Sequence, residues 1–396
     1  MQSNVYVTGM GILSAIGNSV DETFESLSGS LSGIGKIKYL DTLHKDTFVV
    51  GEVKMSNAEL VSKAGVGNYN RTTLLAYLAI KEAMLNAGLT NLTDARTGLV
   101  SSTTVGGICH AELMYKDFFD EKTNENFINS YLSGISTNDI AALIGITDYA
   151  TTISTACSSS ANAIMLGARL IKNNILDRVI VGGVDTLSKF TLNGFNTLMI
   201  LDTEWCKPFD ENRKGLNLGE GAAYLILESE AEVRKHNKTP IARVGGYGNA
   251  NDAFHQTASS PEGAGALLAM QKAFKVAGIK PEEIDYINAH GTGTANNDSS
   301  EGVAMQSMFN GHVPKFSSTK AFTGHTLAAS AAVEAVISIL SMQHSMIFPC
   351  LNRHEQMKDL TITPVDVLEK DVPVNYVLSN SFGFGGNCSS LIFAKK

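Results

Sequence analysis

One cysteine and two histidines, each in a turn of small residues, are the side chains of this sequence best suited to chemistry. Cys157 lies in S-T-A-C-S-S-S, His290 in N-A-H-G-T-G-T and His325 in T-K-A-F-T-G-H. A thiol served by two imidazoles is equipment for acyl transfer through a covalent thioester, because the thiol is the nucleophile and an imidazole can move its proton. The three turns are far apart in the sequence, so only the tertiary fold can bring them together.

The serine-rich segment after Cys157 continues into an apolar pattern, which predicts a helix over residues 158–174 with the cysteine at its first turn. A helix N-terminus stabilises a thiolate, so we expect a lowered pKa for this thiol. The backbone N–H groups that follow are suited to hold an oxyanion. A small buried cysteine without chemistry is the alternative, and the serine-rich setting and the two histidine turns disfavour it.

Both histidines are predicted at the ends of elements, where active-site residues usually lie. His290 follows a strand over residues 285–289, and His325 precedes a buried helix over residues 328–342. Two other interpretations stay open: a mononuclear zinc site with Cys157, and histidines that only bond to core backbone. The zinc site is disfavoured because the sequence has no close ligand pair such as C-x-x-C or H-x-x-x-H, so no metal is predicted.

Lys320 and Glu334 flank His325, and Glu334 interrupts an otherwise apolar helix. A buried carboxylate needs a cationic partner, so we predict an ion pair between these two residues. Whether the pair serves the chemistry or only the fold stays open at this point.

Two glycine-rich segments differ in what they predict. Near the C-terminus, S-N-S-F-G-F-G-G-N-C sets Phe382 and Phe384 among glycines, which predicts backbone N–H groups close to a substrate and an aromatic gate. The early V-T-G-M-G-I-L-S has Ser14 in place of the third glycine of a dinucleotide fingerprint and no clear acidic partner, so NAD binding is not predicted.

The composition predicts a large buried interior and disfavours several classes of protein. The chain has 396 residues, of which 44% are hydrophobic and only 18% charged, and its net charge of −8 disfavours nucleic-acid binding. The 5 cysteines form no C-x-x-C pair and the N-terminus shows no signal peptide, which favours a reducing, cytoplasmic setting. The longest apolar run, residues 326–342, contains a glutamate and is predicted to be a buried helix rather than a membrane span.

Short apolar segments alternate with longer helical patterns, which predicts a layered α/β fold. The second half repeats the element order of the first, and the polar turn H-N-K-T-P predicts a boundary between two halves, 1–238 and 239–396. The predicted strands are 5–8, 98–101, 178–182, 222–228, 285–289, 375–379 and 389–394, and the predicted helices are 20–27, 71–87, 158–174, 264–277 and 328–342.

Together with V-Y-V-T-G-M-G-I-L-S-A-I-G-N at the start and P-F-D-E-N-R-K-G-L-N-L-G-E-G-A at 208–222, these motifs resemble the elongating β-ketoacyl-acyl-carrier-protein synthases of the thiolase superfamily over nearly the full chain. The resemblance implies a thiolase-like fold of duplicated halves in a five-layer αβαβα arrangement, in a homodimer or a heterodimer with a related subunit. It implies decarboxylative Claisen condensation, in which an acyl chain held on cysteine reacts with malonyl-acyl-carrier protein to give a 3-oxoacyl chain two carbons longer. No cofactor is implied beyond the phosphopantetheine that arrives on the carrier protein.

The same resemblance implies roles for individual residues. Cys157 is the nucleophile, and His290 and His325 complete a Cys–His–His triad, which favours elongation over initiation. Lys320 and Glu334 match the family's charged support pair. The remaining matches are the N–H groups of Cys157 and Phe384 for the oxyanion hole, Phe382 and Phe384 for the gate, Thr257, Thr292 and Thr294 for the phosphopantetheine arm, and Val105 for the limit of the acyl pocket.

An acidic carrier protein needs a local basic patch on this acidic chain. The candidates are Lys63, Arg71, Arg213 and Lys214, which we expect to be exposed near the mouth of the tunnel. The alternative is that they are solvated surface charges without a partner.

Three departures from the family pattern concern the substrate. Residues 109–147 form a short segment without the usual proline-containing pattern, G-G-N-C replaces G-G-T-N, and T-G-H-T-L-A-A-S-A replaces a more glycine-rich version. They favour a specialised paralogue that elongates polyene or polyketide chains over the fatty-acid enzyme, which stays open. A thiolase-type or non-elongating acyltransferase also stays open, as does the chain-length-determining subunit of a ketosynthase heterodimer. The presence of Cys157 argues against such a subunit, because chain-length-determining subunits lose the nucleophile.

Overall fold

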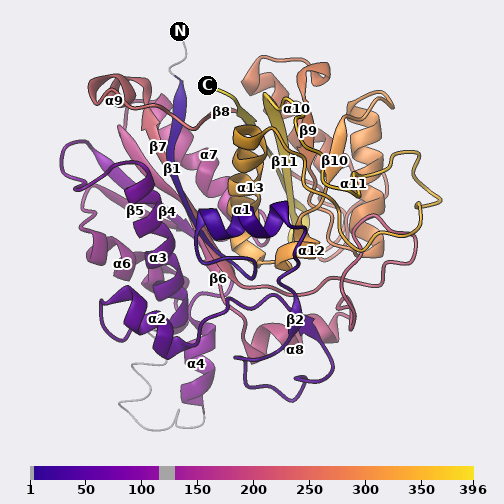
Figure 1. Ribbon diagram of the computed structural model, residues 1–396, viewed down its shortest axis with the longest axis horizontal. Helices are drawn as coiled ribbons and strands as arrows, with labels where there is room; N and C mark the ends of the chain where they lie inside the picture. The colour runs from indigo at the N-terminus through magenta and orange to yellow at the C-terminus, as the bar shows by residue number, and fades with distance from the viewer. Residues whose placement is uncertain (1–3, 116–129) are drawn as a thin grey trace.

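The computed structural model describes residues 4–115 and 130–396, and Figure 1 shows its layered arrangement. The main sheet has 10 strands in the order β10-β9-β11-β12-β8-β1-β7-β6-β4-β5. Read outward from the central pair of β1 and β8, each side has the first strand of its half, then the fifth, fourth, second and third. The strands of the first half are β1 (Val5–Leu13), β4 (Thr97–Ser102), β5 (Tyr149–Ile153), β6 (Arg178–Asp185) and β7 (Gly221–Ser229), and those of the second are β8 (Ala242–Asn251), β9 (Tyr286–Asn288), β10 (Lys315–Ser317), β11 (Tyr376–Gly383) and β12 (Asn387–Ala394).

The strand directions repeat along with the order. β7 is antiparallel to β1 and β6, and β12 is antiparallel to β8 and β11. β4 is parallel to β5 and β6, and β9 is parallel to β10 and β11. The two halves meet where Tyr6 pairs with Arg243 and Val7 with Ala242. The duplicated architecture predicted from the element order is therefore confirmed.

Helices form three layers around the two halves of this sheet. In the central layer, α7 and α13 share one apolar core with strands of both halves, through residues such as Ile164, Val336, Val181 and Val377. The outer layers pack against the opposite faces, with α3 and α6 on the first half and α10 and α11 on the second. Together these are the five layers of a thiolase-like fold. Their bounds are α3 (Arg71–Asn86), α6 (Ser133–Ile144), α7 (Ser159–Lys172), α10 (Ala264–Ala277), α11 (Ala295–Met308) and α13 (Ser330–His344).

Glycines in the first strand of each half let an outer helix approach closely. A Cβ on Gly11 of β1 would lie 2.1 Å from the carbonyl oxygen of Ala79 in α3. A Cβ on Gly248 of β8 would lie 2.1 Å from the carbonyl oxygen of Ala269 in α10. The early G-M-G motif therefore serves helix–strand packing, which explains its likeness to a nucleotide fingerprint.

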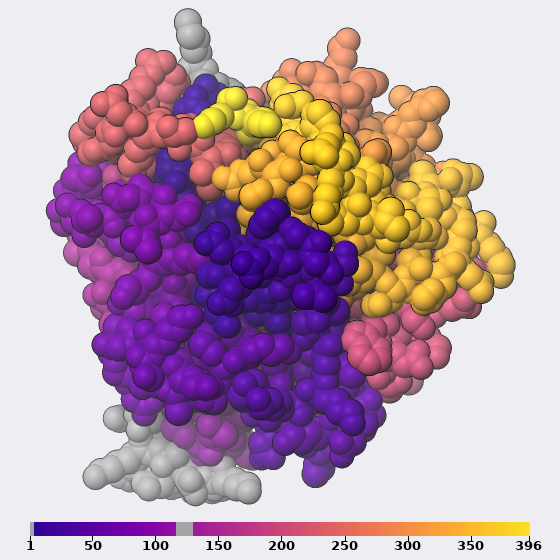
Figure 2. Space-filling view, viewed as in Figure 1, coloured from indigo at the N-terminus to yellow at the C-terminus, as the bar shows by residue number. Residues whose placement is uncertain are grey.

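The segment Leu327–His344 is long and apolar enough to span a membrane, but 89% of that window is buried inside the protein. This confirms the prediction of a buried core helix. Part of its cover is α1 (Val20–Ser28), whose Phe24 stacks on His344 with ring centroids 3.7 Å apart. Figure 2 shows the indigo N-terminal segment lying between the purple first half and the yellow end of the chain.

Every predicted strand and helix is present, with bounds that differ by a few residues. The sequence analysis missed elements that are short, polar or poorly periodic, such as β5, β10 and α11, whereas β8 is the new strand that was expected, without bounds, after the polar turn H-N-K-T-P. The predicted boundary at residue 238 lies in the turn between α9 and β8. The other elements are β2 (Gly35–Lys36), β3 (Val49–Val50), α2 (Asn57–Ala64), α4 (Ile108–Met114), α8 (Lys189–Thr197), α9 (Glu230–Lys235) and α12 (Lys320–Thr323).

Candidate active site

The three predicted catalytic turns meet inside the protein. Cys157 follows β5, His290 follows β9, and His325 comes shortly after β10, so all three lie beyond the carboxyl ends of parallel strands. Cys157 Sγ lies 3.0 Å from His325 Nε2, and the two imidazole rings form an edge-on pair with centroids 5.3 Å apart. None of the three residues is more than 7% exposed. The duplicated topology thus brings together residues that are up to 168 positions apart.

The serines around Cys157 hold the turn that presents it. Ala156 has a φ of 53°, an uncommon left-handed conformation that needs support from its surroundings. Ser159 Oγ donates to the carbonyl oxygen of Ala156 at 2.5 Å, and Ser158 Oγ donates to that of Thr155 at 2.8 Å. The small residues that suggested a tight helix start therefore also stabilise a strained nucleophile turn.

The expected lowering of the Cys157 pKa is wrong. Burial raises the pKa of this thiol to about 12, and the nearby positive charge of Lys320 offsets the effect only in part. The reason is that the helix N-terminus lies in a fully buried site, where loss of hydration costs the thiolate more than the helix dipole returns. The resting nucleophile is therefore a thiol, and it needs a base to take its hydrogen.

His325 is placed to be that base. Burial and the Lys320 charge lower its pKa well below 6.5, so the ring is neutral. With a thiol hydrogen directed at Nε2, the ring's own hydrogen is on Nδ1, which lies 3.2 Å from Ser330 Oγ. The backbone of His325 is held on both sides, because its N–H donates to the carbonyl oxygen of Asn217 and its carbonyl oxygen accepts from Gly219.

His290 has the opposite arrangement of hydrogens. Lys320 Nζ lies 3.1 Å from His290 Nδ1, donates to the His290 carbonyl oxygen at 2.6 Å, and forms a buried ion pair with Glu334. An ammonium group only donates, so Nδ1 must accept and the hydrogen of the neutral ring is on Nε2. Burial first, and then the positive charge of Lys320, lower the His290 pKa well below 6.5. Burial raises the pKa of Glu334 to about 7.

Buried carboxylates that the sequence analysis missed shape the loops of the site. Glu301 accepts hydrogen bonds from the N–H groups of His290 and Gly291, both at 2.8 Å. Asp298, one turn earlier in α11, accepts from the next two N–H groups, and Asp185 accepts from Ala328 N–H at 2.8 Å in the loop after His325. The sequence signal that could have revealed the first two was the pair of acidic residues in the segment after G-T-G-T, because carboxylates close to a turn often accept hydrogen bonds from its N–H groups.

A cavity of about 290 Å³ opens onto the triad. Its lining includes the three predicted threonines Thr257, Thr292 and Thr294, and the two aromatic residues Phe382 and Phe384. Val105 is not among the described residues that line this cavity. Its N–H group instead bonds to Asp185 Oδ1 at 3.3 Å, so its predicted role at the acyl pocket stays a prediction.

The turn that carries Phe384 is tied to neighbouring segments. Gly385 N–H donates to the carbonyl oxygen of Gln256 at 2.7 Å, next to Thr257. A Cβ on Gly383 would lie 2.9 Å from the backbone nitrogen of Cys157, so this turn touches the cysteine turn. The backbone of Phe384 thus lies beside the nucleophile, and its ring stacks on Phe195 with centroids 6.0 Å apart.

Two of the four predicted docking residues are not exposed, so that prediction is wrong for them. The Arg71 side chain is 9% exposed and pairs with Glu220 at 2.6 Å. The Arg213 side chain is 8% exposed and donates to the carbonyl oxygen of Ala295 at 2.9 Å. Both guanidinium side chains fold back onto the protein and fix turns, and the amino-acid composition does not reveal this. Lys63 and Lys214 are exposed, and Lys214 also lines the cavity.

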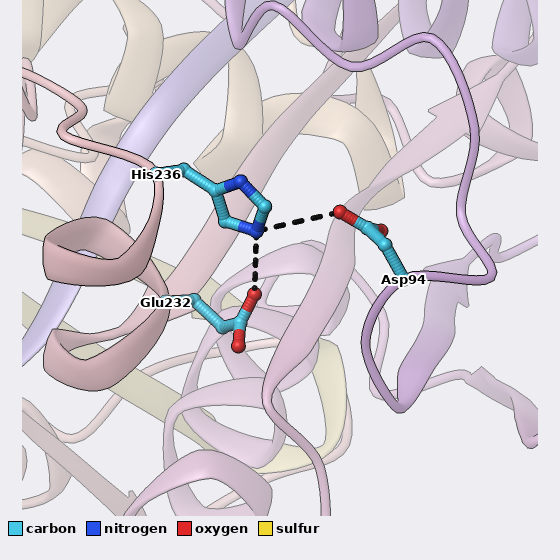
Figure 3. A group of neighbouring side chains, drawn as sticks. All are labelled: Asp94, Glu232 and His236. Atoms are coloured by element: carbon cyan, nitrogen blue, oxygen red, sulfur yellow. Dashed lines mark ion pairs between the residues drawn. The ribbon is translucent and has the colours of Figure 1, made fainter.

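Away from the triad, Asp94, Glu232 and His236 bring possible metal ligands together in the described part of the chain (Figure 3). His236 Nε2 lies 3.4 Å from Asp94 Oδ2 and 3.2 Å from Glu232 Oε2. However, Arg178 already pairs with Asp94 at 2.8 Å and Lys235 with Glu232 at 3.1 Å. The group is an ion-pair network near the amino ends of β4 and β6, and its cations disfavour a metal.

Comparison with known proteins gives the same family at both ends of the chain. The profile of the β-ketoacyl synthase N-terminal domain matches residues 2–233, and that of the C-terminal domain matches residues 241–354. The 3-oxoacyl-[acyl-carrier-protein] synthase 2 of Staphylococcus aureus (strain N315) is 33% identical over 407 residues, covering 99% of this chain and 98% of that protein. The enzyme of the same name from Coxiella burnetii is 31% identical over 410 residues, with 99% and 98% covered.

Solved structures extend the likeness to the whole fold. The ishigamide ketosynthase/chain length factor has a TM-score of 0.93 and 28% identity, with both chains fully covered at 100%. The ketosynthase ApeO in complex with its chain length factor ApeC, from Xenorhabdus doucetiae, has a TM-score of 0.87 and 30% identity, with 100% and 98% covered. From the two matched domains and the full-length relatives, this chain belongs to the β-ketoacyl synthase family.

Proposed function

We propose that this protein elongates an acyl chain held on Cys157, with malonyl-acyl-carrier protein as the donor of the two added carbons. The observation that carries the proposal is the 3.0 Å contact between Cys157 Sγ and His325 Nε2. Beside it lies the imidazole of His290, whose Nε2 is a hydrogen-bond donor because Lys320 occupies its Nδ1. A nucleophile, a base and a fixed donor in one cavity are what a condensation through a thioester requires.

In the first half-reaction, Cys157 takes the acyl group from a carrier-protein thioester. His325 Nε2 accepts the thiol hydrogen as sulfur attacks the carbonyl carbon, and passes it to the departing pantetheine sulfur. The N–H groups of Cys157 and Phe384 stabilise the oxyanion, since the two turns are in contact at Gly383. The products are acyl-Cys157 and a free carrier thiol, so atoms and charge balance.

In the second half-reaction, the malonyl thioester oxygen accepts hydrogen bonds from Nε2 of both histidines. These donors stabilise the enolate that forms as carbon dioxide leaves, because the lowered pKa values keep both rings neutral. His290 already carries its hydrogen on Nε2, whereas the hydrogen of His325 has to be on Nε2 rather than Nδ1 for this step. The enolate carbon attacks acyl-Cys157, and the cysteine leaves as a thiolate that takes a proton from solvent. Lys320 acts through His290 and not on the substrate.

Several features support a carrier protein as substrate. The cavity is polar on the side of Thr257, Thr292 and Thr294, as expected for contacts with a phosphopantetheine arm. Lys214, exposed beside it, is suited to meet an acidic carrier. No metal or diffusible cofactor enters these steps, and the cysteines of the described chain, which form no disulfide, favour a cytoplasmic setting.

The two solved ketosynthase/chain length factor relatives support a proposal for the partner and the pathway. Their likeness favours a polyene or polyketide pathway, and a heterodimer with a related subunit over a homodimer. Within residues 4–115 and 130–396, β5 is an edge strand of the sheet, and Leu113 and Leu132 are 63% and 50% exposed, which supports a subunit interface. Fatty-acid elongation is the second candidate, and the Staphylococcus aureus and Coxiella relatives favour it.

Intact-mass measurement across a panel of acyl-carrier proteins tests the proposal. Wild-type protein should gain an acyl adduct and then release a 3-oxoacyl-carrier protein after malonyl-carrier protein is added. Cys157→Ala should lose both reactions, whereas Cys157→Gln, which places a polar amide where the acyl carbonyl would be, should still release carbon dioxide from malonyl-carrier protein. Condensation at a normal rate by Cys157→Ala would show that the covalent mechanism is wrong.

A further inference from the structure

The two active-site histidines differ in what fixes their hydrogens. His290 Nδ1 faces an ammonium group at 3.1 Å, which only donates and therefore allows one neutral form of the ring. His325 Nδ1 faces a hydroxyl, Ser330 Oγ, at 3.2 Å. A hydroxyl carries one hydrogen and two lone pairs, so it can either donate to this nitrogen or accept from it.

If the proposed function holds, the two half-reactions require His325 to adopt both neutral forms and His290 only one. In acylation, His325 Nε2 must be bare to accept the thiol hydrogen, so the ring hydrogen is on Nδ1. In decarboxylation, Nε2 must carry a hydrogen to donate to the enolate oxygen, so Nδ1 is bare. His290 acts only in the second step and needs only one form.

We propose that Ser330 is a positioning residue for His325 that serves both forms of the ring, accepting from Nδ1–H during acylation and donating to bare Nδ1 during decarboxylation. Between the two steps one hydrogen leaves Nδ1 and one arrives at Nε2 by exchange with water in the open cavity, so the charge of the ring is unchanged. Ser330 lies within T-G-H-T-L-A-A-S-A, one of the segments in which the sequence departs from the family pattern.

The position of Ser330 suits this role. It is the first residue of α13, and both it and His325 are 2% exposed, so the contact lies in the protein interior beside the cavity. The loop between them is anchored by Ala328 N–H on Asp185, and α13 by Ala332 N–H on Ser160 Oγ at 2.9 Å. The hydroxyl is therefore held beside the ring and only its hydrogen has to reorient.

The test separates the two half-reactions in three variants. Ser330→Ala removes the hydroxyl, Ser330→Thr keeps it, and Ser338→Ala is the matched control, since Ser338 is a fully buried serine of the same helix whose Oγ has no partner in the described structure. Acylation is followed as the rate of adduct formation on Cys157, and decarboxylation as carbon dioxide release from malonyl-carrier protein. Thermal unfolding reports on the fold of each variant.

Loss of one neutral hydrogen bond should slow each half-reaction about tenfold in Ser330→Ala. Ser330→Thr should restore both rates, and Ser338→Ala should leave both unchanged. An effect on one half-reaction alone, on neither, or of equal size in Ser338→Ala would overturn the inference. The proposed function fails separately, if wild-type protein forms no adduct on Cys157.

Discussion

Replacing Lys320 by methionine should affect stability and catalysis for different reasons. The Lys320 and Glu334 side chains are 2% and 3% exposed, so the variant leaves a buried carboxylate without its cation. Breaking a buried pair in this way costs about 3–5 kcal/mol of unfolding free energy. Burial already raises the pKa of Glu334 to about 7, so this carboxyl can take up a proton near neutral pH, and we expect a loss near the lower value.

The catalytic loss comes from the other contact of the ammonium group. Without Lys320 at 3.1 Å, His290 Nδ1 is free to carry the ring hydrogen, and Nε2 then has none to donate to the enolate oxygen. Loss of one such donor costs about 3–4 kcal/mol, a fall of roughly 100- to 1000-fold in the rate of decarboxylation. Acylation of Cys157 should fall much less, because that step uses His325.

A double variant separates the two effects. Lys320→Met with Glu334→Leu replaces the pair by apolar side chains of similar size, which is often neutral or stabilising, so urea unfolding should recover. Carbon dioxide release from malonyl-carrier protein should not recover. Decarboxylation at the wild-type rate in a stably folded double variant would refute the reasoning that Lys320 fixes the hydrogens of His290.

Three further predictions concern pH, docking and a buried ion pair. Burial is the main cause that places the pKa values of His290 and His325 well below 6.5, so the decarboxylation rate should stay flat as pH falls through 6.5. Below pH 6.5 the unfolded chain binds more protons at these two rings than the folded chain does. The unfolding free energy that the neutral rings contribute is therefore present above pH 6.5 and is lost as pH falls. A decarboxylation rate that drops with an inflection near pH 6.5 would contradict the lowered pKa values of the two histidines. Lys214→Glu should raise the apparent KM for acyl-carrier protein and spare small thioester mimics, since this exposed lysine lies at the cavity. Arg71→Glu should instead lower unfolding free energy by about 3–5 kcal/mol through its broken pair with Glu220, and a stable variant with only a raised KM would restore Arg71 as a docking residue.

The amino-acid sequence by itself determined the chemistry and the architecture, because both depend on local pattern. The turns around Cys157, His290 and His325 are short stretches in which residue type and neighbours already indicate the reaction. The strands and helices follow from periodicity, and the helix predicted over 264–277 has those bounds in the structure. The duplication was visible in the order of elements, although only the strand order and directions establish it.

Only the tertiary structure decided how charges and hydrogens are arranged, because these depend on contacts between distant segments and on burial. The pKa of Cys157 is raised and not lowered, since the helix N-terminus that was expected to stabilise its thiolate lies in a buried site where the thiolate loses its hydration. The Arg71 side chain is only 9% exposed because it pairs with Glu220, a partner 149 positions away. The fixed hydrogens of His290 come from Lys320, 30 positions later, and the contact of Ser330 with His325 depends on the path of one loop. No local pattern contains such distances, and this is the physical reason that the sequence indicates the reaction while the folded chain determines which nitrogen holds each proton.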